Sequence, residues 1–199
     1  MNNNPLSHLD SYDIMLASAS PRRRELLAML EVPFTIAPPL DIEESYPSDL
    51  PAVEVAPYLA RLKSHAYSPQ GNQMIITADT VVVAPDATVL GKPRDARDAA
   101  MMLRRLSGAP HDVVTGVAVA TAERREVISC TTRVTFAPLS DSEIDFYIDR
   151  FKPFDKAGAY GIQEWIGAAA VASISGSYYN VMGLPIHRLY TLLRDNFAR

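Results

Sequence analysis

The chain passes from a strand to a helix within the stretch DIMLASASPRRRELL, residues 13–27. The first six residues of this stretch form an apolar run that is long enough for one buried strand. Ser20 then stands as an N-cap residue, and Pro21 occupies the first helical position, where its missing N–H costs nothing. A strand that leads directly into a helix is the unit from which α/β proteins are built.

The same alternation continues along the rest of the chain. Apolar and β-branched runs predict strands over residues 32–37, 74–84, 88–90, 113–120 and 127–136. Helical spacing predicts helices over residues 21–31, 51–67, 94–107 and 140–149, and another that begins at Pro185. Pro57 should delay the start of the second of these helices or kink it. We therefore expect an α/β fold with a mixed central sheet flanked by helices.

The segments between these elements are read from their composition. Residues 38–49 are proline-rich and acidic and predict a surface loop, and residues 158–183 are dotted with glycine. Ser140 and Glu143 have the spacing of a capping box at a helix start. No internal repeat or long linker interrupts the chain, so we expect one domain over residues 13–199.

The first twelve residues are polar and Asn-rich, without the cationic and apolar regions of a signal peptide. They predict a disordered polar tail over residues 1–12. No apolar run approaches the roughly 20 residues that a membrane span requires, so we expect no membrane partner. The lone cysteine, Cys130, excludes an intramolecular disulfide and fits a reducing cytoplasmic location.

Composition narrows the functional classes further. The chain has 199 residues, with 19 Lys and Arg against 23 Asp and Glu, and its net charge of −4 argues against a general nucleic-acid binder. One cysteine and four scattered histidines offer no zinc-ligand spacing. The chain also lacks the glycine-rich phosphate loops of P-loop and Rossmann enzymes and the Gly-x-Ser-x-Gly elbow of α/β-hydrolases.

The strand-to-helix transition is the first candidate site. Ser18 and Ser20 precede a helix whose first turn carries Arg22, Arg23 and Arg24. Arginines are unfavourable at the positive end of a helix dipole unless an anion neutralises them, so the segment predicts an anion site. One or two of the arginines should then engage a ligand and one should be structural. The alternative is a solvated basic cap.

Asp79 is the second candidate, because it interrupts the apolar run 74–83. A carboxylate in a buried strand is costly unless it is paired or binds a metal. With Thr80 it offers the hard oxygen atoms that Mg²⁺ prefers. Alternatively, the strand breaks at Thr77 and Asp79 is a turn or cap residue.

Further candidates carry weaker local signals. Lys92 follows a short strand and precedes a proline, Lys63 lies on a predicted helix, and Glu43 and Glu44 lie in the acidic loop. In the stretch 155–163, closely spaced glycines, a tyrosine and a glutamine suit a loop around a planar ligand. The amide of Gln163 can present both a donor and an acceptor to a base edge. A plain hairpin turn is equally compatible with that stretch.

Seven short motifs occur in one order along nearly the whole chain. They are LASASPRR (16–23), ADT (78–80), GKP (91–93), LRRLSG (103–108), TGV (115–117), DKAGAYGIQ (155–163) and GLP (183–185). In this order and spacing they resemble the Maf family of nucleoside triphosphate pyrophosphatases. The resemblance implies two lobes around a deep cleft, similar to inosine triphosphatases, and a possible homodimer.

The resemblance also implies an activity. Such an enzyme cleaves a nucleoside triphosphate between its α and β phosphates and requires a divalent metal, Mg²⁺ or Mn²⁺. The 155–163 motif looks like that of the branch acting on dTTP and UTP, and modified pyrimidine nucleotides are expected as further substrates. Two alternatives are a 7-methyl-GTP-type pyrophosphatase and a nucleotide-binding regulator of cell division or septum formation. The expected partner is a small triphosphate rather than a nucleic acid.

In the family, the residue matching Asp79 is the proposed catalytic base, and those matching Arg22, Thr80 and Gln163 are linked to substrate choice. The full prediction assigns catalysis to Asp79, Lys92 and Lys63, substrate binding to Arg22, Thr80, Gln163, Ser18, Ser20, Arg23 and Lys156, and the metal to Asp79, Glu43 and Glu44. The chain departs from many relatives at Glu164-Trp165, where the indole either stacks on the base or braces the loop.

Overall fold

The computed structural model describes residues 4–197, which contain one mixed β-sheet. The strands are β1 (Asp13–Ala17), β2 (Thr35–Ile36), β3 (Gln73–Val83), β4 (Val89–Leu90), β5 (Pro110–Ala120), β6 (Arg125–Phe136) and β7 (Val171–Ser175). Their order is β2-β1-β3-β5-β6-β7, with β4 paired to β3. β1 runs parallel to β2 and β3, and the other pairs are antiparallel. The predicted mixed sheet is confirmed.

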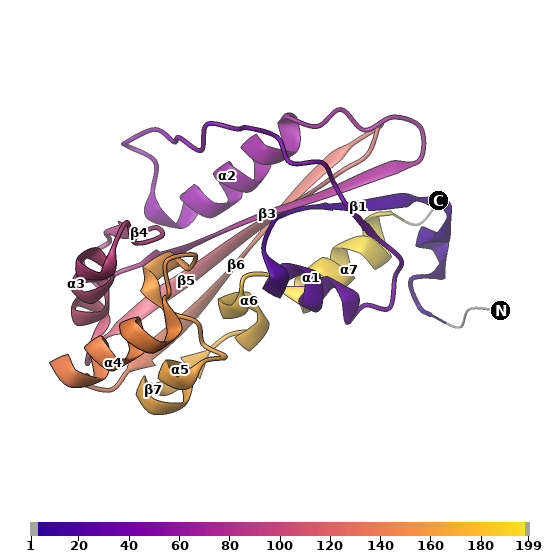
Figure 1. Ribbon diagram of the computed structural model, residues 1–199. Coiled ribbons are helices and arrows are strands. Elements are labelled where there is room, and N and C mark those ends of the chain that lie inside the picture. The colour runs from indigo at the N-terminus through magenta and orange to yellow at the C-terminus, as the bar shows by residue number, and fades with distance from the viewer. Residues whose placement is uncertain (1–3, 198–199) are drawn as a thin grey trace.

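Helices lie on both faces and at one end of this sheet (Figure 1). They are α1 (Pro21–Ala28), α2 (Ala52–His65), α3 (Ala96–Leu106), α4 (Asp141–Phe151), α5 (Trp165–Ala170), α6 (Tyr178–Met182) and α7 (Ile186–Asn196), with short 3-10 helices η1 (Ser7–Ser11) and η2 (Ala157–Ala159). α2 covers one face, whereas α1, α6 and α7 lie on the other face, and α3, α4 and α5 gather at one end (Figure 1). This layering is the predicted α/β arrangement.

The hydrophobic core is divided along the length of the sheet. One cluster joins β1, α1 and α7 through Leu16, Leu27 and Leu189. A second joins α3, α4 and α5 to the other end of the sheet, and a third packs α2 onto the opposite face. β3 and β5 contribute to all three clusters. These long strands therefore hold two lobes together, as the family resemblance implied.

Most predicted elements are present, with changes at their ends. The strand expected over residues 32–37 is only Thr35–Ile36, and the first helix ends at Ala28 rather than Glu31. Of the two alternatives for α2, a late start or a kink at Pro57, the late start is wrong, because the helix begins at Ala52 and contains Pro57. The capping box of Ser140 and Glu143 is confirmed at α4. The glycine-dotted stretch contains η2, α5, β7 and α6, none of which was predicted.

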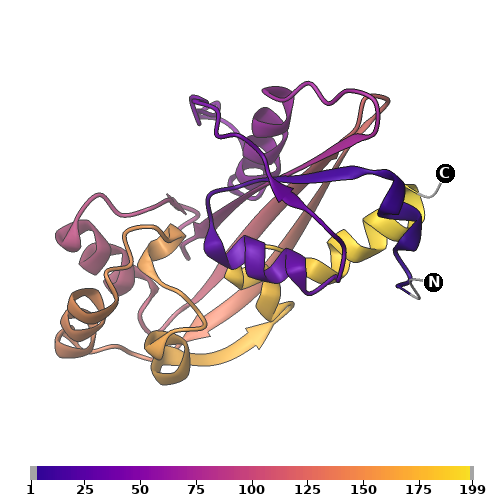
Figure 2. The same cartoon turned by 45° about the vertical axis from the view of Figure 1, so that its right-hand side comes forward.

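The disordered tail predicted over residues 1–12 is wrong for residues 4–12, and residues 1–3 lie outside the described part of the chain. Leu6 and Leu9 are 0% and 2% exposed and belong to the first core cluster. The Asn4 side-chain amide donates to the carbonyl of Leu30 at 3.0 Å, and His8 Nε2 lies 3.1 Å from the carbonyl oxygen of Leu193. Both leucines pack in the same cluster as residues of α1 and α7, and η1 lies beside α7 (Figure 2).

Within residues 4–197, no helix combines the length and the apolar composition needed to cross a membrane.

Candidate functional site

A cleft with a cavity volume of about 790 Å³ opens between the two lobes. Its walls come from the start of α1, the loop after β2, the last turn of α2, the middle of β3, the segment after β4 and the loop before α5. The predicted residues that line it are Ser18, Ser20, Arg22, Arg23, Glu44, Lys63, Asp79, Thr80, Lys92, Lys156 and Gln163. The structure therefore brings together residues spread over most of the chain.

Asp79 lies inside β3 rather than at its end. The strand continues to Val83, and Asp79 is in register with Gly116 on β5. The alternative in which the strand breaks at Thr77 is therefore wrong. Asp79 Oδ1 accepts a hydrogen bond from Lys63 Nζ at 2.6 Å, and the two side chains are only 13% and 15% exposed. This ion pair offsets the free-energy cost of desolvating a carboxylate in an apolar strand.

Lys63 lies between two carboxylates, because its ammonium also contacts Glu44 Oε2 at 2.8 Å. Glu44 comes from the acidic loop, which forms part of the cleft wall. Two carboxylates that share one cation are chemically suited to Mg²⁺, which proteins commonly hold with one or two carboxylates plus substrate phosphates. The donor set therefore fits the implied metal.

Glu43 does not join this pair. Its side chain is exposed, and it is absent from the cleft wall. Within residues 4–197, no group of three or more His, Cys, Asp or Glu side chains could hold a metal ion. Of the predicted metal set, Asp79 and Glu44 line the cleft and Glu43 lies outside it.

Cationic groups face the cleft from both lobes. Arg22, in the first turn of α1, donates from one terminal nitrogen to Asp155 Oδ2 at 3.0 Å, across the cleft. Lys92 is exposed in the segment after β4 and lines the same cavity. Ser18 Oγ accepts from the backbone N–H of Ser20 at 3.3 Å. Arg22 and Ser18 lie at the N-terminal end of α1, where an anion is favoured, and Lys92 lines the same cleft.

Arg23 is not free to bind a ligand as predicted. Its guanidinium donates to the carbonyl oxygens of Gly183 (2.8 Å) and Ala78 (2.9 Å) and to the hydroxyl of Thr80 (3.0 Å). Burial lowers the pKa of Arg23, and the nearby charge of Asp79 opposes that shift. Arg23 is therefore the structural arginine of the three, and it ties α1 to β3 and to the segment before α7.

Thr80 is likewise occupied within the protein. Its hydroxyl accepts from Arg23 and lies 2.9 Å from the hydroxyl of Thr115, which donates to the carbonyl of Asn180 at 3.0 Å. In this chain of bonds Thr80 is the donor to Thr115. The hydrogen bonds favour a positioning role for Thr80 over the predicted contact with a base.

The loop before α5 forms the wall opposite α1. Gly158 adopts φ 67°, and a Cβ there would lie 2.8 Å from a methyl group of Val82, so the position requires glycine. Its N–H donates to the carbonyl of Gly91 at 3.0 Å, which joins this loop to the segment carrying Lys92. Gln163 is exposed and lines the cleft.

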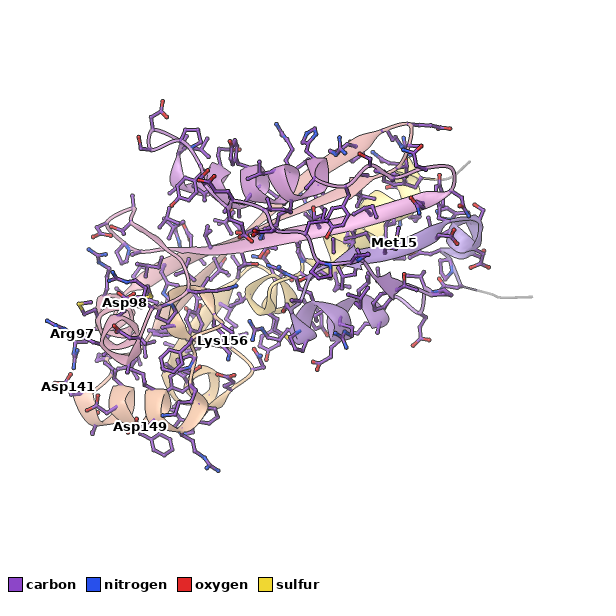
Figure 3. The ribbon with its side chains drawn as sticks, turned by 45° about the horizontal axis from the view of Figure 1, so that its top comes forward. Met15, Arg97, Asp98, Asp141, Asp149 and Lys156 are labelled. Carbon is purple, nitrogen blue, oxygen red and sulfur yellow. The ribbon has the colours of Figure 1, made fainter. Side chains whose placement is uncertain are left out.

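Lys156, labelled in Figure 3, is also held by protein groups. Its ammonium lies 2.8 Å from Asp155 Oδ1 and 3.1 Å from Glu164 Oε1, and its side chain is 8% exposed. These contacts make Lys156 an internal counter-ion rather than the predicted substrate ligand. Partial burial works to raise the pKa of Asp155, but the hydrogen bonds from Lys156 and Arg22 outweigh it and lower that pKa.

Sequence reasoning missed the roles of two side chains behind this wall, Tyr147 and Glu164, and left two alternatives for a third, Trp165. Tyr147 has helical core spacing and no local signal of a polar role, yet its hydroxyl contacts Glu164. Glu164 was noted only as a departure from relatives. Trp165 packs edge-to-face on Phe146 with 5.0 Å between ring centroids and is absent from the cleft wall, so it braces the loop.

The fold and the cleft together define a mixed α/β protein whose two lobes enclose a cleft lined by a carboxylate pair and by cations. Residues 13–196 match the family model for Maf-like proteins, and the chain belongs to that family. A relative from Porphyromonas gingivalis (strain W83), described as dTTP/UTP pyrophosphatase, is 52% identical over 194 residues, covering 96% of this chain and 97% of the relative.

Other relatives carry the same description. The protein from Phocaeicola vulgatus is 51% identical and covers 95% of this chain and 98% of its own length. Among solved structures, a HAM1 protein from Coxiella burnetii aligns with a TM-score of 0.48 at 17% identity, over 92% of this chain and 98% of that one. The family assignment rests on the family match and the sequence relatives.

Proposed function

We propose that this protein hydrolyses dTTP and UTP at the bond between the α and β phosphates, releasing the nucleoside monophosphate and pyrophosphate. One observation carries the proposal: the carboxylates of Asp79 and Glu44, bridged by Lys63, face the cations Arg22 and Lys92 in one cleft. The names of relatives about 50% identical agree with it. The cavity of about 790 Å³ is in the size range of ligand pockets.

The polyphosphate would lie against the start of α1 and the cations around it. Arg22 offers a planar fork of donors that matches phosphate oxygens, and it can exchange its carboxylate partner Asp155 for them. Lys92 and Lys63 would neutralise the charge that develops on the leaving pyrophosphate. The hydroxyls of Ser18 and Ser20 lie at the same helix end.

Asp79 is positioned as the general base. A water molecule attacks phosphorus, its proton passes to the carboxylate of Asp79, and the bridging P–O bond breaks with its electron pair on the leaving group. Lys63 fixes the orientation of that carboxylate through the 2.6 Å contact. A divalent metal held by Asp79 and Glu44 would supply Lewis-acid polarisation of a phosphoryl oxygen.

Gln163 would read the base. Its amide offers a donor and an acceptor side by side, which complements the imide edge shared by thymine and uracil. A substituent at position 5 of the ring leaves that edge unchanged. Pyrimidine triphosphates modified at position 5 are therefore proposed as additional substrates.

A panel of canonical and modified triphosphates, incubated with Mg²⁺, tests the proposal by the amounts of pyrophosphate and monophosphate released. We expect release from dTTP and UTP, and loss of release on chelation with EDTA. Asp79→Asn should lower kcat by about a thousandfold, because general-base catalysis is removed, while circular dichroism stays that of the parent. Release from 7-methyl-GTP alone, or parental turnover by the Asn variant, contradicts the assignment.

We further propose a cytoplasmic location, since nucleoside triphosphates are made and used there, and a homodimer. Analytical ultracentrifugation at micromolar concentration distinguishes the dimer from the monomer.

A further inference from the structure

Gln163 stands within a tight turn of the loop before α5. The backbone N–H of Glu164 donates to the carbonyl of Gly161 at 3.0 Å, so Gln163 is the third residue of a four-residue turn. The direction in which the amide of Gln163 points therefore depends on how firmly this turn is held.

The turn is clamped at both of its ends by one phenol. The hydroxyl of Tyr147 accepts from the backbone N–H of Gly161 at 3.0 Å and donates to Glu164 Oε2. Tyr147 is 0% exposed and stacks on Phe151. Burial raises the pKa of Tyr147, and so does its hydrogen bond to Glu164, so the hydroxyl stays protonated and remains a donor.

The other oxygen of Glu164 is anchored as well. Glu164 Oε1 lies 3.1 Å from Lys156 Nζ, and the two side chains are 19% and 8% exposed. A buried ammonium restricts where this carboxylate can go, because separating the pair would leave a charge without its partner. The carboxylate of Glu164 therefore stays in one place against the turn.

Neighbouring groups pack closely against the turn. A Cβ on Gly161 would lie 2.9 Å from the carboxyl carbon of Glu164 and 3.0 Å from the side chain of Lys156. A Cβ on Gly167, at the start of α5, would lie 1.8 Å from the carbonyl oxygen of Ile162. The turn is thus enclosed by the clamp on one side and by α5 on the other.

We propose that Tyr147 and Glu164 are positioning residues that determine base specificity by fixing the turn that presents Gln163. The inference rests on the proposed function, in which Gln163 reads a pyrimidine edge. Neither residue touches the group that would activate water, since Asp79 is held by Lys63 from α2. Loss of the clamp should therefore affect base recognition and leave the chemical step nearly unchanged.

The test compares the parent with Tyr147→Phe, Glu164→Gln and the double variant, by measuring kcat and KM for UTP and CTP. We expect the preference for UTP over CTP in kcat/KM to fall about tenfold in each variant, the size of effect of one lost hydrogen bond. The change should lie in KM, with kcat within about twofold of the parent. The double variant should show no larger loss than either single one, because the two residues act as one unit.

Tyr178→Phe and Glu54→Gln are the matched controls, since Tyr178 is 40% exposed, Glu54 is exposed, and neither lines the cleft. Both should keep the parental preference. A retained preference in Tyr147→Phe and Glu164→Gln, a fall in kcat at constant KM, or additive losses would each overturn the inference. If one variant fails to fold, the other carries the same test.

Titration calorimetry of UTP and CTP on the Asp79→Asn background separates this inference from the proposed function. Binding that favours UTP, and loses this preference on Tyr147→Phe, supports the clamp even if the parent hydrolyses neither nucleotide. Hydrolysis of UTP together with an unchanged binding preference leaves the proposed activity standing and overturns the clamp.

Discussion

His111, on β5, shows how far burial can shift the pKa of one side chain. Its ring is 2% exposed, and Nε2 lies 2.8 Å from the hydroxyl of Tyr160. The ring also contacts Phe136 edge-to-face at 4.9 Å. Desolvation lowers the pKa of His111 to about 4, so the folded protein keeps this imidazole neutral at any pH above that value.

A pH dependence of stability follows from this shift. The unfolded chain takes up the His111 proton near pH 6.5 and the folded chain only near pH 4, so stability is complete above pH 6.5 and is lost as the pH falls toward 4. At pH 4.5 the loss amounts to about 2 kcal/mol. Urea unfolding at pH 7 and pH 4.5 measures it.

The control for His111 is the variant His111→Gln, which removes the titrating group. Its free energy of unfolding should fall less between the two pH values than that of the parent. An equal fall in both proteins would show that the acid sensitivity comes from other groups.

At the scale of elements, the packing of α2 against β5 decides where Lys63 lies. A Cβ on Gly116 would lie 2.4 Å from the Cα of Pro57 and 2.5 Å from the carbonyl oxygen of Ala56. These atoms are backbone and cannot move without moving the helix. Gly116 therefore lets α2 approach the sheet closely enough for Lys63, in the last turn, to reach Asp79.

Gly116→Ala is expected to destabilise the fold by about 3 kcal/mol, since overpacking against backbone forces α2 away from β5. The same shift should lower kcat, because it lengthens the contact between Lys63 and Asp79. Thermal unfolding and pyrophosphate release are the two measurements. Gly91→Ala is the stability control, because a Cβ there meets nothing within 4 Å. Equal unfolding midpoints for the two variants would contradict this account.

The sequence predicts some elements well because their pattern is local. β5 and β6 are long runs rich in β-branched residues, which predict strands. The start of α4 is predicted by the capping box of Ser140 and Glu143. β7 and α6 are only five residues long and depend on contacts with β6 and β5 that lie far away in the sequence. Their own residues carry too little signal to predict them.

The candidate site divides in the same way. The motif order was enough to gather Asp79, Lys92, Arg22 and Gln163 into one prediction, and these residues line one cleft with Lys63, which lies in none of the motifs. The motif order could not predict which hydrogen-bond or ion-pair partner each of these side chains has. Which hydroxyls and carbonyls surround a guanidinium depends on how β3, α1 and the segment before α7 meet, and no local pattern encodes that meeting.

At the scale of the whole molecule, charge is arranged in pairs across the cleft. The net charge of −4 is compatible with a polyanionic ligand, because the cations that matter converge in one place. Arg22 pairs with Asp155 on the opposite wall, and Lys63 pairs with Asp79 and Glu44. In the proposed function, a triphosphate would replace these carboxylates as the partner of the cations rather than fill a bare cationic site.

The same scale explains why the N-terminal segment matters for the whole chain. Leu6 and Leu9 pack into the cluster that joins β1, α1 and α7, so the segment that carries these two leucines closes the lobe that carries Arg22. Leu6→Ala should destabilise the protein by about 3 kcal/mol, because it removes a fully buried side chain and leaves a cavity. Urea unfolding measures this loss. Ser7→Ala, at an exposed position of η1, should change the free energy of unfolding by less than about 0.5 kcal/mol.

The activity of Leu6→Ala is a separate expectation. Below its unfolding transition this variant should keep the parental KM and kcat, since Leu6 does not line the cleft. If Leu6→Ala has parental stability, the segment does not stabilise the fold. A changed KM would show that the packing of Leu6 affects the geometry of the cleft.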